Sequence, residues 1–230
     1  MVNAQLMIPA AGMGQRLGCE MPKALVDLAG RPMLLQTLGR FESFAWSGPV
    51  IVLCPEGHQE AFADVLAEAA PPSGCRLLPG GERRQDSVAR GLAALETATE
   101  VVVIHDAARP FIEPWSVQAS IEAARDCGAA TVAVPAVDTL LEGDEDGFLV
   151  QTPERRRMWA CQTPQTFRVE VIRQAHERAQ AEELSVTDDA TLVRMTGGTV
   201  RLVAGTPLNF KVTNATDLAL AEAVLREGLL

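Results

Sequence analysis

The sequence predicts an α/β fold in which a mostly parallel central sheet is covered by helices on both faces. Short, nearly all-apolar runs alternate with amphipathic helical stretches over the first 135 residues, and these runs lack the polar alternation of a half-exposed strand. The 230 residues suffice for one large domain. An apolar fraction of 47 % with 22 % charged residues is ordinary for a soluble globular protein.

The elements follow one another in strand–helix order. We expect strands at 5–9, 49–54, 76–80, 101–104 and 129–135, with helices at 33–44, 58–70, 86–96 and 115–128. Asp86 or Ser87 is expected to cap the third of these helices, and Gly128 to end the fourth.

The alternation breaks between Val137 and Gln165. There the acidic loop "EGDEDG" separates the short runs "DTLL" and "FLVQT", which predicts a hairpin or arm with a turn near Asp146-Gly147. Beyond it we expect helices at 165–182, 187–196 and 215–227, and an apolar strand run in "NFKVT". Without a repeat or a low-complexity tract, the sequence predicts a single domain over 1–230, with a projecting arm at 137–162.

Charge and composition exclude several functions. A net charge of −10 argues against non-specific binding to nucleic acid or to an anionic membrane, since both need a basic face. The longest apolar runs are too short to cross a bilayer, and the N-terminus lacks a secretion signal, so we expect a cytoplasmic protein. The five cysteines are scattered, which argues against a disulfide framework or a zinc site and predicts small buried thiols.

In an open α/β sheet, ligands bind at the carboxyl ends of the strands. The segments to inspect are therefore 10–23, 79–87, 105–110, 135–139 and the stretch around Lys211. Each places charged or hydroxylic residues just after an apolar run.

The first of these segments, "AAGMGQRLG", fits a phosphate-binding turn. Its glycines do not match the dinucleotide fingerprint, because the third comes one place late and no acidic residue ends the second strand in the required way. A Walker loop is absent as well. What remains is a cradle of backbone N–H groups with Arg16 inside it and Lys23 beyond it. Lys23 could instead be a solvated surface lysine, but Pro22 stiffens the chain where it must be aimed.

Two further segments contain candidates for binding a nucleotide base and a metal ion. In "PGGERRQDSV", bare backbone at Gly80 and Gly81 beside a helix start fits recognition of a flat base, and equally an ordinary connecting turn. In "VVVIHDAARPF", Asp106 emerges at the edge of the sheet, where one carboxylate suits Mg²⁺ that keeps waters and substrate phosphates as its other ligands. Arg109 could meet a second anion, or simply pair with Asp106 at the surface.

The remaining candidates lie later in the chain. "PAVDTLL" places Thr139 after a strand, and "PERRRMWACQTPQTF" combines three consecutive arginines with Thr163. A basic triplet is usually a solvated face, but on an arm it could complete a neighbouring subunit's site. A strand lysine between apolar neighbours, as at Lys211, suits the floor of a cleft.

Taken together, these motifs resemble the bacterial 2-C-methyl-D-erythritol 4-phosphate cytidylyltransferases of the non-mevalonate isoprenoid pathway. The resemblance rests on "PAAGMGQRL…PKAL", "GGERRQDSV", "HDAARPF", "PAVDT", "TPQTF" and "NFKVT…DLALAE", in the family's order from about Met7 to Glu222. It implies a Rossmann-like nucleotidyltransferase domain, CTP and methylerythritol phosphate as substrates, Mg²⁺ or another divalent cation, and a homodimer formed through the arm.

The resemblance also implies roles for individual residues. The triphosphate turn would be Pro9, Ala10, Ala11, Gly12, Met13 and Gly14, and the cytosine and ribose would lie against Gly80, Gly81, Asp86 and Ser87. The catalytic set would be Arg16, Lys23, Asp106 and Lys211, with Asp106 on the metal side. Methylerythritol phosphate would contact Asp106, Arg109, Thr139, Thr163, Lys211 and Arg155 from the partner subunit. Leu208 stands where relatives often carry an acidic residue, which leaves Asp106 without a second expected carboxylate.

Three alternatives remain open at this point. Ribitol 5-phosphate could replace methylerythritol phosphate as the acceptor, because the CTP half of the site would be shared. A nucleotide-dependent oxidoreductase on a Rossmann sheet is disfavoured by the late third glycine and the missing acidic partner. A non-catalytic nucleotide-binding module is disfavoured by the full set of cations around Asp106.

Overall fold

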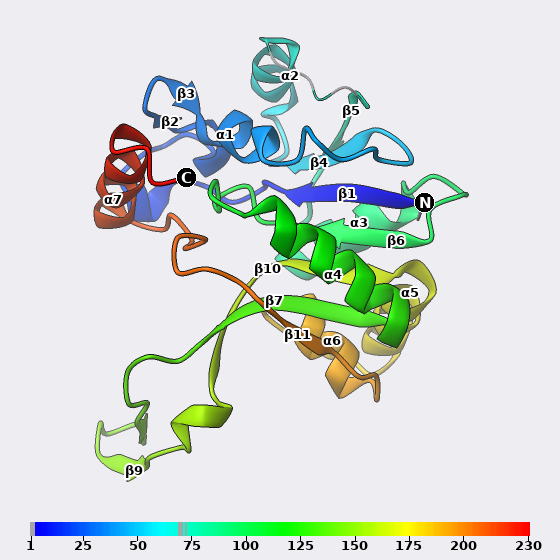
Figure 1. Cartoon of the computed structure of the whole chain (residues 1–230). Coiled ribbons are helices and arrows are strands. Elements are labelled where there is room, and N and C mark those ends of the chain that lie inside the picture. Colours follow the sequence, from blue (N-terminus) through cyan, green and yellow to red (C-terminus); the bar gives the residue numbers. More distant parts are fainter. Residues whose placement is uncertain (1–2, 69–70, 72) are drawn as a thin grey trace.

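A computed structural model, which describes residues 3–68, 71 and 73–230, shows a seven-stranded sheet (Figure 1). Its order is β11-β7-β10-β6-β1-β4-β5. The strands are β1 (Ala4–Pro9), β4 (Val50–Cys54), β5 (Cys75–Pro79), β6 (Val101–Ile104), β7 (Ala129–Pro135), β10 (Trp159–Arg168) and β11 (Arg201–Ala204). All neighbours pair in parallel except β10, which is antiparallel to both β6 and β7. The predicted mostly parallel α/β sheet is confirmed.

Helices cover both faces of the sheet. One hydrophobic core joins the sheet to α1 (Met33–Gly39), α2 (Gln59–Glu68) and α4 (Pro114–Cys127). A second core joins the opposite face to α3 (Arg84–Ala93), α5 (Val169–Ala181) and α6 (Asp189–Met195). The last helix, α7 (Ala215–Arg226), packs beside the small hairpin of β2 (Asp27–Leu28) and β3 (Arg31–Pro32).

Successive residues of a central strand enter opposite cores. In β1, Leu6 and Ile8 belong to the first core and Met7 to the second, and all three are fully buried. This two-sided burial explains the unbroken apolar runs. Each such side chain contributes about 1.5–3 kcal/mol relative to exposure, so the central strands fix where their carboxyl ends lie.

The largest departure from the prediction is β10. Residues 165–168, expected to begin a helix, are strand, and α5 starts only at Val169. The strand carries buried polar side chains, each with a partner: Thr166 Oγ1 lies 2.8 Å from Ser120 Oγ, and Gln162 donates to the Thr206 carbonyl. Because these buried side chains are polar and hydrogen-bonded, a search for apolar runs misses this central strand.

Smaller departures concern the ends of elements. "NFKVT" is irregular rather than strand, and the run "DTLL" is not strand either, since β8 is Glu142–Gly143 opposite β9 (Leu149–Gln151). Helix α1 ends at Gly39 rather than near residue 44, and α6 begins at Asp189 rather than 187. Residues 69–70 of the second expected helix lie outside the described residues. Of the five free cysteines, only Cys54 is buried.

The cap of α3 also differs from expectation. The N-cap residue is Arg83, and the Asp86 carboxylate, three residues on, accepts from the Arg83 backbone N–H at 3.1 Å. The Ser87 hydroxyl instead accepts from the Gly81 N–H at 2.9 Å. Gly128 ends α4 as predicted, with a positive φ of 93°.

Between β7 and β10 the chain leaves the sheet as an extended segment (Figure 1). It holds the β8–β9 hairpin and a single 3₁₀ turn, Arg155–Arg157. Large apolar side chains on it are open to solvent, among them Val137 at 81 %, Phe148 at 71 % and Leu141 at 64 % exposure. Within the described part of the chain, no helix is long and apolar enough to cross a membrane.

Candidate active site

The carboxyl ends of β1 and β6 open into a cleft of about 240 Å³. The cleft brings together most of the residues predicted for the nucleotide half of a site: Pro9, Ala10, Ala11, Gly12, Met13, Arg16, Lys23, Gly81, Ser87, Asp106 and Lys211. These residues come from segments that are far apart in the sequence. Their convergence follows from the parallel strands, whose carboxyl ends meet at one edge.

The first loop folds back on itself, which explains the distance in sequence between the glycine turn and Lys23. The Lys23 N–H donates to the Gly12 carbonyl at 3.0 Å, and the Gly14 N–H donates to the Met21 carbonyl at 3.0 Å. Met13 also forms a β-bridge with Pro22. The lysine therefore returns to the start of the turn, so that a cation and the backbone cradle face the same cleft.

The second loop lies directly against the first. A Cβ added to Gly80 would come within 2.6 Å of the Ala11 Cβ, and one added to Gly81 within 2.4 Å of the Asp86 Cβ. Glycine at position 80 therefore allows the two loops to touch, and glycine at position 81 allows the second loop to pack on the start of α3. This tight packing is compatible with a base clamp and with an ordinary connecting turn.

Asp106, directly after β6 and His105, is the electrostatic centre of the cleft. Its Oδ2 lies 2.7 Å from Lys211 Nζ and 3.9 Å from Arg109 Nε, and its Oδ1 lies 3.4 Å from Arg84 Nε. Burial alone would raise the pKa of the carboxyl, but the charges of Lys211 and Arg84 outweigh it and hold that pKa well below its usual range. The Asp106–Arg109 contact is buried, not a surface salt bridge.

Thr163 and His105 hold the backbone of Asp106. The Thr163 hydroxyl accepts from the Asp106 N–H at 3.1 Å and lies 3.0 Å from His105 Nδ1. Because His105 Nε2 lies 2.9 Å from the Arg109 carbonyl, an acceptor, Nε2 carries the proton and Nδ1 accepts from the threonine. Burial lowers the pKa of His105 to about 4, which keeps it neutral. The role of His105 is therefore structural.

Lys23 occupies an unusual environment for a lysine. Burial, and then the positive charge of Lys211, lower its pKa from 10.5 to about 8, against a smaller opposing effect of Asp106. A partly buried lysine close to other cations is suited to bind an anion. The triphosphate of a nucleotide is such an anion.

Arg84 is a residue of the cleft that the sequence analysis missed. It stands at the first position of α3, donates toward Asp106, and pairs with the buried Asp189 at 2.5 Å. Although burial opposes it, the charges of Asp189 and Asp106 hold its pKa above the ordinary value. Its position after the Gly80-Gly81 turn, at the carboxyl edge of the sheet, was the available signal.

Other predicted residues lie outside the lining of the cleft. Gly14 and Gly80 are buried beside it, and Arg109 and Thr163 stand behind Asp106. Thr139 and Arg155 are exposed on the projecting segment, where Arg155 Nη1 donates to the Val137 carbonyl at 3.1 Å. Within one chain, these two do not join the site.

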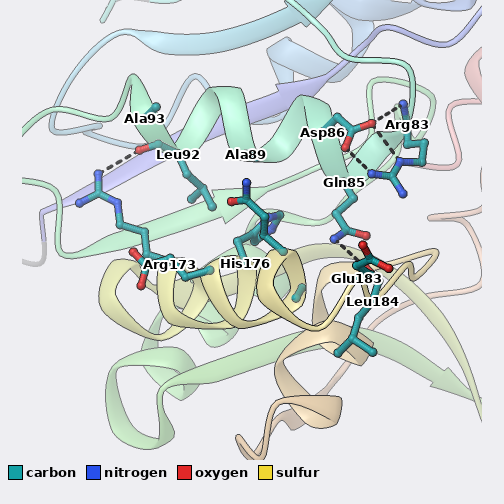
Figure 2. A pocket seen from close by; sticks show the side chains of 13 residues that line it. Arg83, Gln85, Asp86, Ala89, Leu92, Ala93, Arg173, His176, Glu183 and Leu184 are labelled. Carbon is teal, nitrogen blue, oxygen red and sulfur yellow. Dashed lines mark hydrogen bonds and ion pairs between the residues drawn. The ribbon is translucent and has the colours of Figure 1, made fainter.

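Asp86 lines a different and larger hollow. This groove, of about 650 Å³, lies between α3 and α5. Figure 2 shows Asp86 paired with Arg83 at the start of α3. The groove contains neither lysine nor Asp106. Size alone would favour it, but the convergent cations and backbone donors lie in the smaller cleft.

The metal-binding capacity of the protein itself is small. Over 3–68, 71 and 73–230, no group of three or more His, Cys, Asp or Glu side chains is placed to hold a metal ion. Asp106 is buried, and Glu82, the other carboxylate that lines the cleft, is exposed. Leu208 packs in the core beside α7 and supplies no carboxylate. This donor set fits only a cation that takes most of its ligands from substrate phosphates and water.

Comparisons with known proteins agree with this geometry. The profile of the family 2-C-methyl-D-erythritol 4-phosphate cytidylyltransferase (IspD) matches residues 4–227. A protein of that name from Deinococcus radiodurans is 47 % identical over 220 residues, covering 95 % of this chain and 88 % of the relative. Another from Pelotomaculum thermopropionicum is 40 % identical, covering 96 % and 93 %.

Solved structures point the same way. The 2-C-methyl-D-erythritol 4-phosphate cytidylyltransferase of Thermus thermophilus is 37 % identical, with a TM-score of 0.79 and coverage of 98 % of this chain and all of that one. The 4-diphosphocytidyl-2C-methyl-D-erythritol synthase of Anaerococcus prevotii reaches a TM-score of 0.87 at 28 % identity, with coverage of 98 % and 96 %. The predicted resemblance is thus confirmed over nearly the full length. This chain belongs to the 2-C-methyl-D-erythritol 4-phosphate cytidylyltransferase family.

Proposed function

We propose that the cleft transfers CMP from CTP to 2-C-methyl-D-erythritol 4-phosphate, giving 4-diphosphocytidyl-2-C-methyl-D-erythritol and pyrophosphate. The observation that carries this proposal is the set of cations around Asp106: Lys211, Arg84 and Arg109 face the carboxylate, and Lys23 lies in the same cleft. Membership of the family favours methylerythritol phosphate over ribitol phosphate as the acceptor.

The chemistry is an in-line displacement at phosphorus. An oxygen of the acceptor's phosphate attacks the α-phosphorus of CTP, the new P–O–P bond forms, and pyrophosphate leaves with the electrons of the broken bond. The acceptor phosphate is already ionised at neutral pH, so no general base is needed, which matches a neutral, buried His105. The task of the protein is to position two anions and to neutralise the charge that concentrates at the α-phosphate.

Each loop has a part in this task. The turn Pro9–Gly14 would wrap the triphosphate, with Arg16 and Lys23 gripping it at separate points. Gly80, Gly81 and Ser87 would clamp the cytosine and ribose, while Arg109 and Lys211 would hold the acceptor phosphate. Asp106 balances the cations so that they can be gathered in one cleft before substrate arrives.

Mg²⁺ would be held by Asp106 together with the triphosphate. It would supply positive charge at the phosphates, as in other phosphoryl-transfer sites. Both carboxylate oxygens of Asp106 already face cations of the protein. A divalent cation is therefore expected to bind with the nucleotide rather than before it.

The active unit would be a homodimer formed through the arm at 137–162 of a single domain. Phe148, Leu141 and Val137 are too exposed for an isolated chain and fit an interface core. Arg155 and Thr139 lie on the same segment, so that pairing of two arms would bring them to the partner's cleft. A cytoplasmic location stays a prediction from the sequence.

The test of the reaction is pyrophosphate release with CTP and Mg²⁺. Parallel mixtures contain methylerythritol 4-phosphate, ribitol 5-phosphate or no acceptor. Release only with the first supports the proposal, and release only with ribitol phosphate would move the protein to the alternative acceptor. If folded protein released no pyrophosphate in any of the three mixtures, the proposed reaction would be overturned.

A further inference from the structure

Arg84, which lines the cleft, is shared between two carboxylates. Its Nε faces Asp106 Oδ1 at 3.4 Å, and its Nη1 meets Asp189 Oδ2 at 2.5 Å. The Asp189 side chain is 2 % exposed, and the Arg84 side chain 23 %. On its other oxygen, Asp189 lies 3.5 Å from His176 Nε2, an approach that lacks hydrogen-bond geometry. The sequence analysis assigned no role to Arg84, Asp189 or His176.

The Asp189 side chain does not cap helix α6. The N-cap of α6 is Asp188, whose side chain accepts from the Thr191 N–H at 2.9 Å. The Gln165 amide oxygen accepts from the Asp189 and Ala190 N–H groups. The Asp189 carboxylate is therefore left for the Arg84 guanidinium and the His176 ring.

A planar guanidinium held at one edge cannot turn freely. With Nη1 bonded to Asp189, Arg84 reaches Asp106 through Nε alone. Its buried Nη2, the nitrogen that would complete a bidentate pair with Nε, has no partner, and Asp106 Oδ2 stays available to Lys211. Without that hold, Arg84 could rotate and pair with Asp106 through two nitrogens. Such a pair would compete with Lys211 for the carboxylate and draw the cation away from the cleft.

We propose that Asp189 is a positioning residue for the transfer reaction: it fixes Arg84 so that the guanidinium supports Asp106 without capturing it. Arg84 also begins α3, directly after the Gly80–Arg83 loop that faces the nucleotide. The ion pairs Asp189–Arg84 and Arg84–Asp106 thereby link the Gly80–Arg83 loop to the carboxylate at the reacting centre. This inference rests on the proposed function and adds to it a residue outside the cleft.

The experiment compares wild type, Asp189→Asn, Arg84→Met and the double variant, together with Asp188→Asn as the matched control. Asp189→Asn keeps the shape of the side chain and removes its charge, whereas Asn at 188 still caps α6. We expect Asp189→Asn to lower kcat about 10- to 100-fold, the size of effect known for residues that orient the ligands of a metal site. The KM for CTP should change little, because Arg16 and Lys23 remain.

The double variant separates positioning from a merely structural ion pair. If Asp189 acts through Arg84, replacing it in the Arg84→Met background costs no further activity. The melting temperature and calorimetric CTP binding are measured on every variant, so that loss of fold is seen directly. Asp188→Asn should turn over like wild type.

Each outcome decides one point. An inactive wild type overturns the proposed function itself, whereas an active wild type matched by Asp189→Asn overturns only the positioning role. Multiplicative losses in the double variant would show that Asp189 does not act through Arg84, and would also overturn it. Should Asp189→Asn fail to fold, Asp189→Glu is used instead: it keeps the charge but displaces the carboxylate from Arg84, so a fall in kcat at constant KM is expected, and an unchanged kcat contradicts the proposal.

Discussion

Lys211 Nζ lies 2.7 Å from Asp106 Oδ2, although 105 residues separate them in the chain. Lys211 is also the charge that most lowers the pKa of Lys23. The sequence contains only these two lysines, against 18 arginines, and both line the cleft. A compact ammonium with an adjustable pKa is thus found only where this account places the phosphates, and guanidinium serves elsewhere.

The Asp106 carboxylate should stabilise the fold as well as the site. Its pKa is held below the unfolded value, so its contribution is present above about pH 4 and is lost as the pH falls further. Asp106→Asn is expected to lower the free energy of unfolding at pH 7 by about 2 kcal/mol, less than for a fully buried pair because Lys211 is partly exposed. Urea unfolding at pH 7 and pH 3 measures this, and a difference that does not shrink at pH 3 would contradict it.

Lys23 predicts a falling alkaline limb in the pH profile. With a pKa of about 8 in the free protein, the ammonium is lost above pH 8, and kcat/KM for CTP should then fall about tenfold per pH unit. Lys23→Arg keeps its charge, so its profile should stay level to pH 10, at a lower plateau because the planar group fits differently. The same fall in Lys23→Arg would assign the limb to another group.

The two lysines also make a chemical test possible. An amine acylating reagent at pH 8 should modify Lys23 before Lys211, because the lowered pKa leaves more free amine and Lys211 is paired with Asp106. CTP should protect Lys23, which peptide mass spectrometry can follow. Modification of Lys23 that is unaffected by saturating CTP would remove it from the triphosphate site.

The arm predicts complementation between two inactive proteins. Asp106→Asn is expected to disable the cleft of its own chain, and Arg155→Ala to remove the arginine that we propose reaches the partner's cleft. Equal amounts, unfolded and refolded together, should regain about a quarter of wild-type activity, since half of the dimers carry one intact composite site. Recovery no greater than that of the separately refolded proteins would show that each cleft uses its own arm or none.

The proposed dimer interface can be tested by substituting one of its exposed apolar residues. Phe148→Asp places a charge in the proposed core of the interface, whereas Asp64, on the exposed face of α2, offers a neutral comparison as Asp64→Asn. Light scattering should find Phe148→Asp monomeric and Asp64→Asn dimeric. A dimeric Phe148→Asp would place the interface elsewhere.

The cleft was predictable from the sequence where strands were plainly apolar. Asp106 and the turn at Gly12 follow continuous buried runs, so their meeting at one edge followed from the parallel arrangement. Strand β10 was not predictable from the sequence. Gln165 and Thr166 are polar yet buried, and only the tertiary structure supplies their hydrogen-bond partners.

Side-chain partnerships were less predictable than backbone positions. Arg84 and Asp189 are 105 residues apart and give no local signal of contact. Asp86 was expected in the nucleotide site but turns to Arg83 in the α3–α5 groove (Figure 2), because a carboxylate at the third helical position bonds the start of its own helix. Lys211 was placed in the cleft correctly although its predicted strand is an irregular segment.

The most direct measurement follows oxygen through the reaction. Methylerythritol 4-phosphate labelled with ¹⁸O on its phosphate is incubated with CTP, Mg²⁺ and the protein, and the products are read by ³¹P NMR. In-line attack predicts label in the bridge between the two phosphorus atoms of 4-diphosphocytidyl-2-C-methyl-D-erythritol, with unlabelled pyrophosphate. Label in the pyrophosphate, or a product whose bridge is unlabelled, would contradict attack by the acceptor phosphate on the α-phosphorus of CTP.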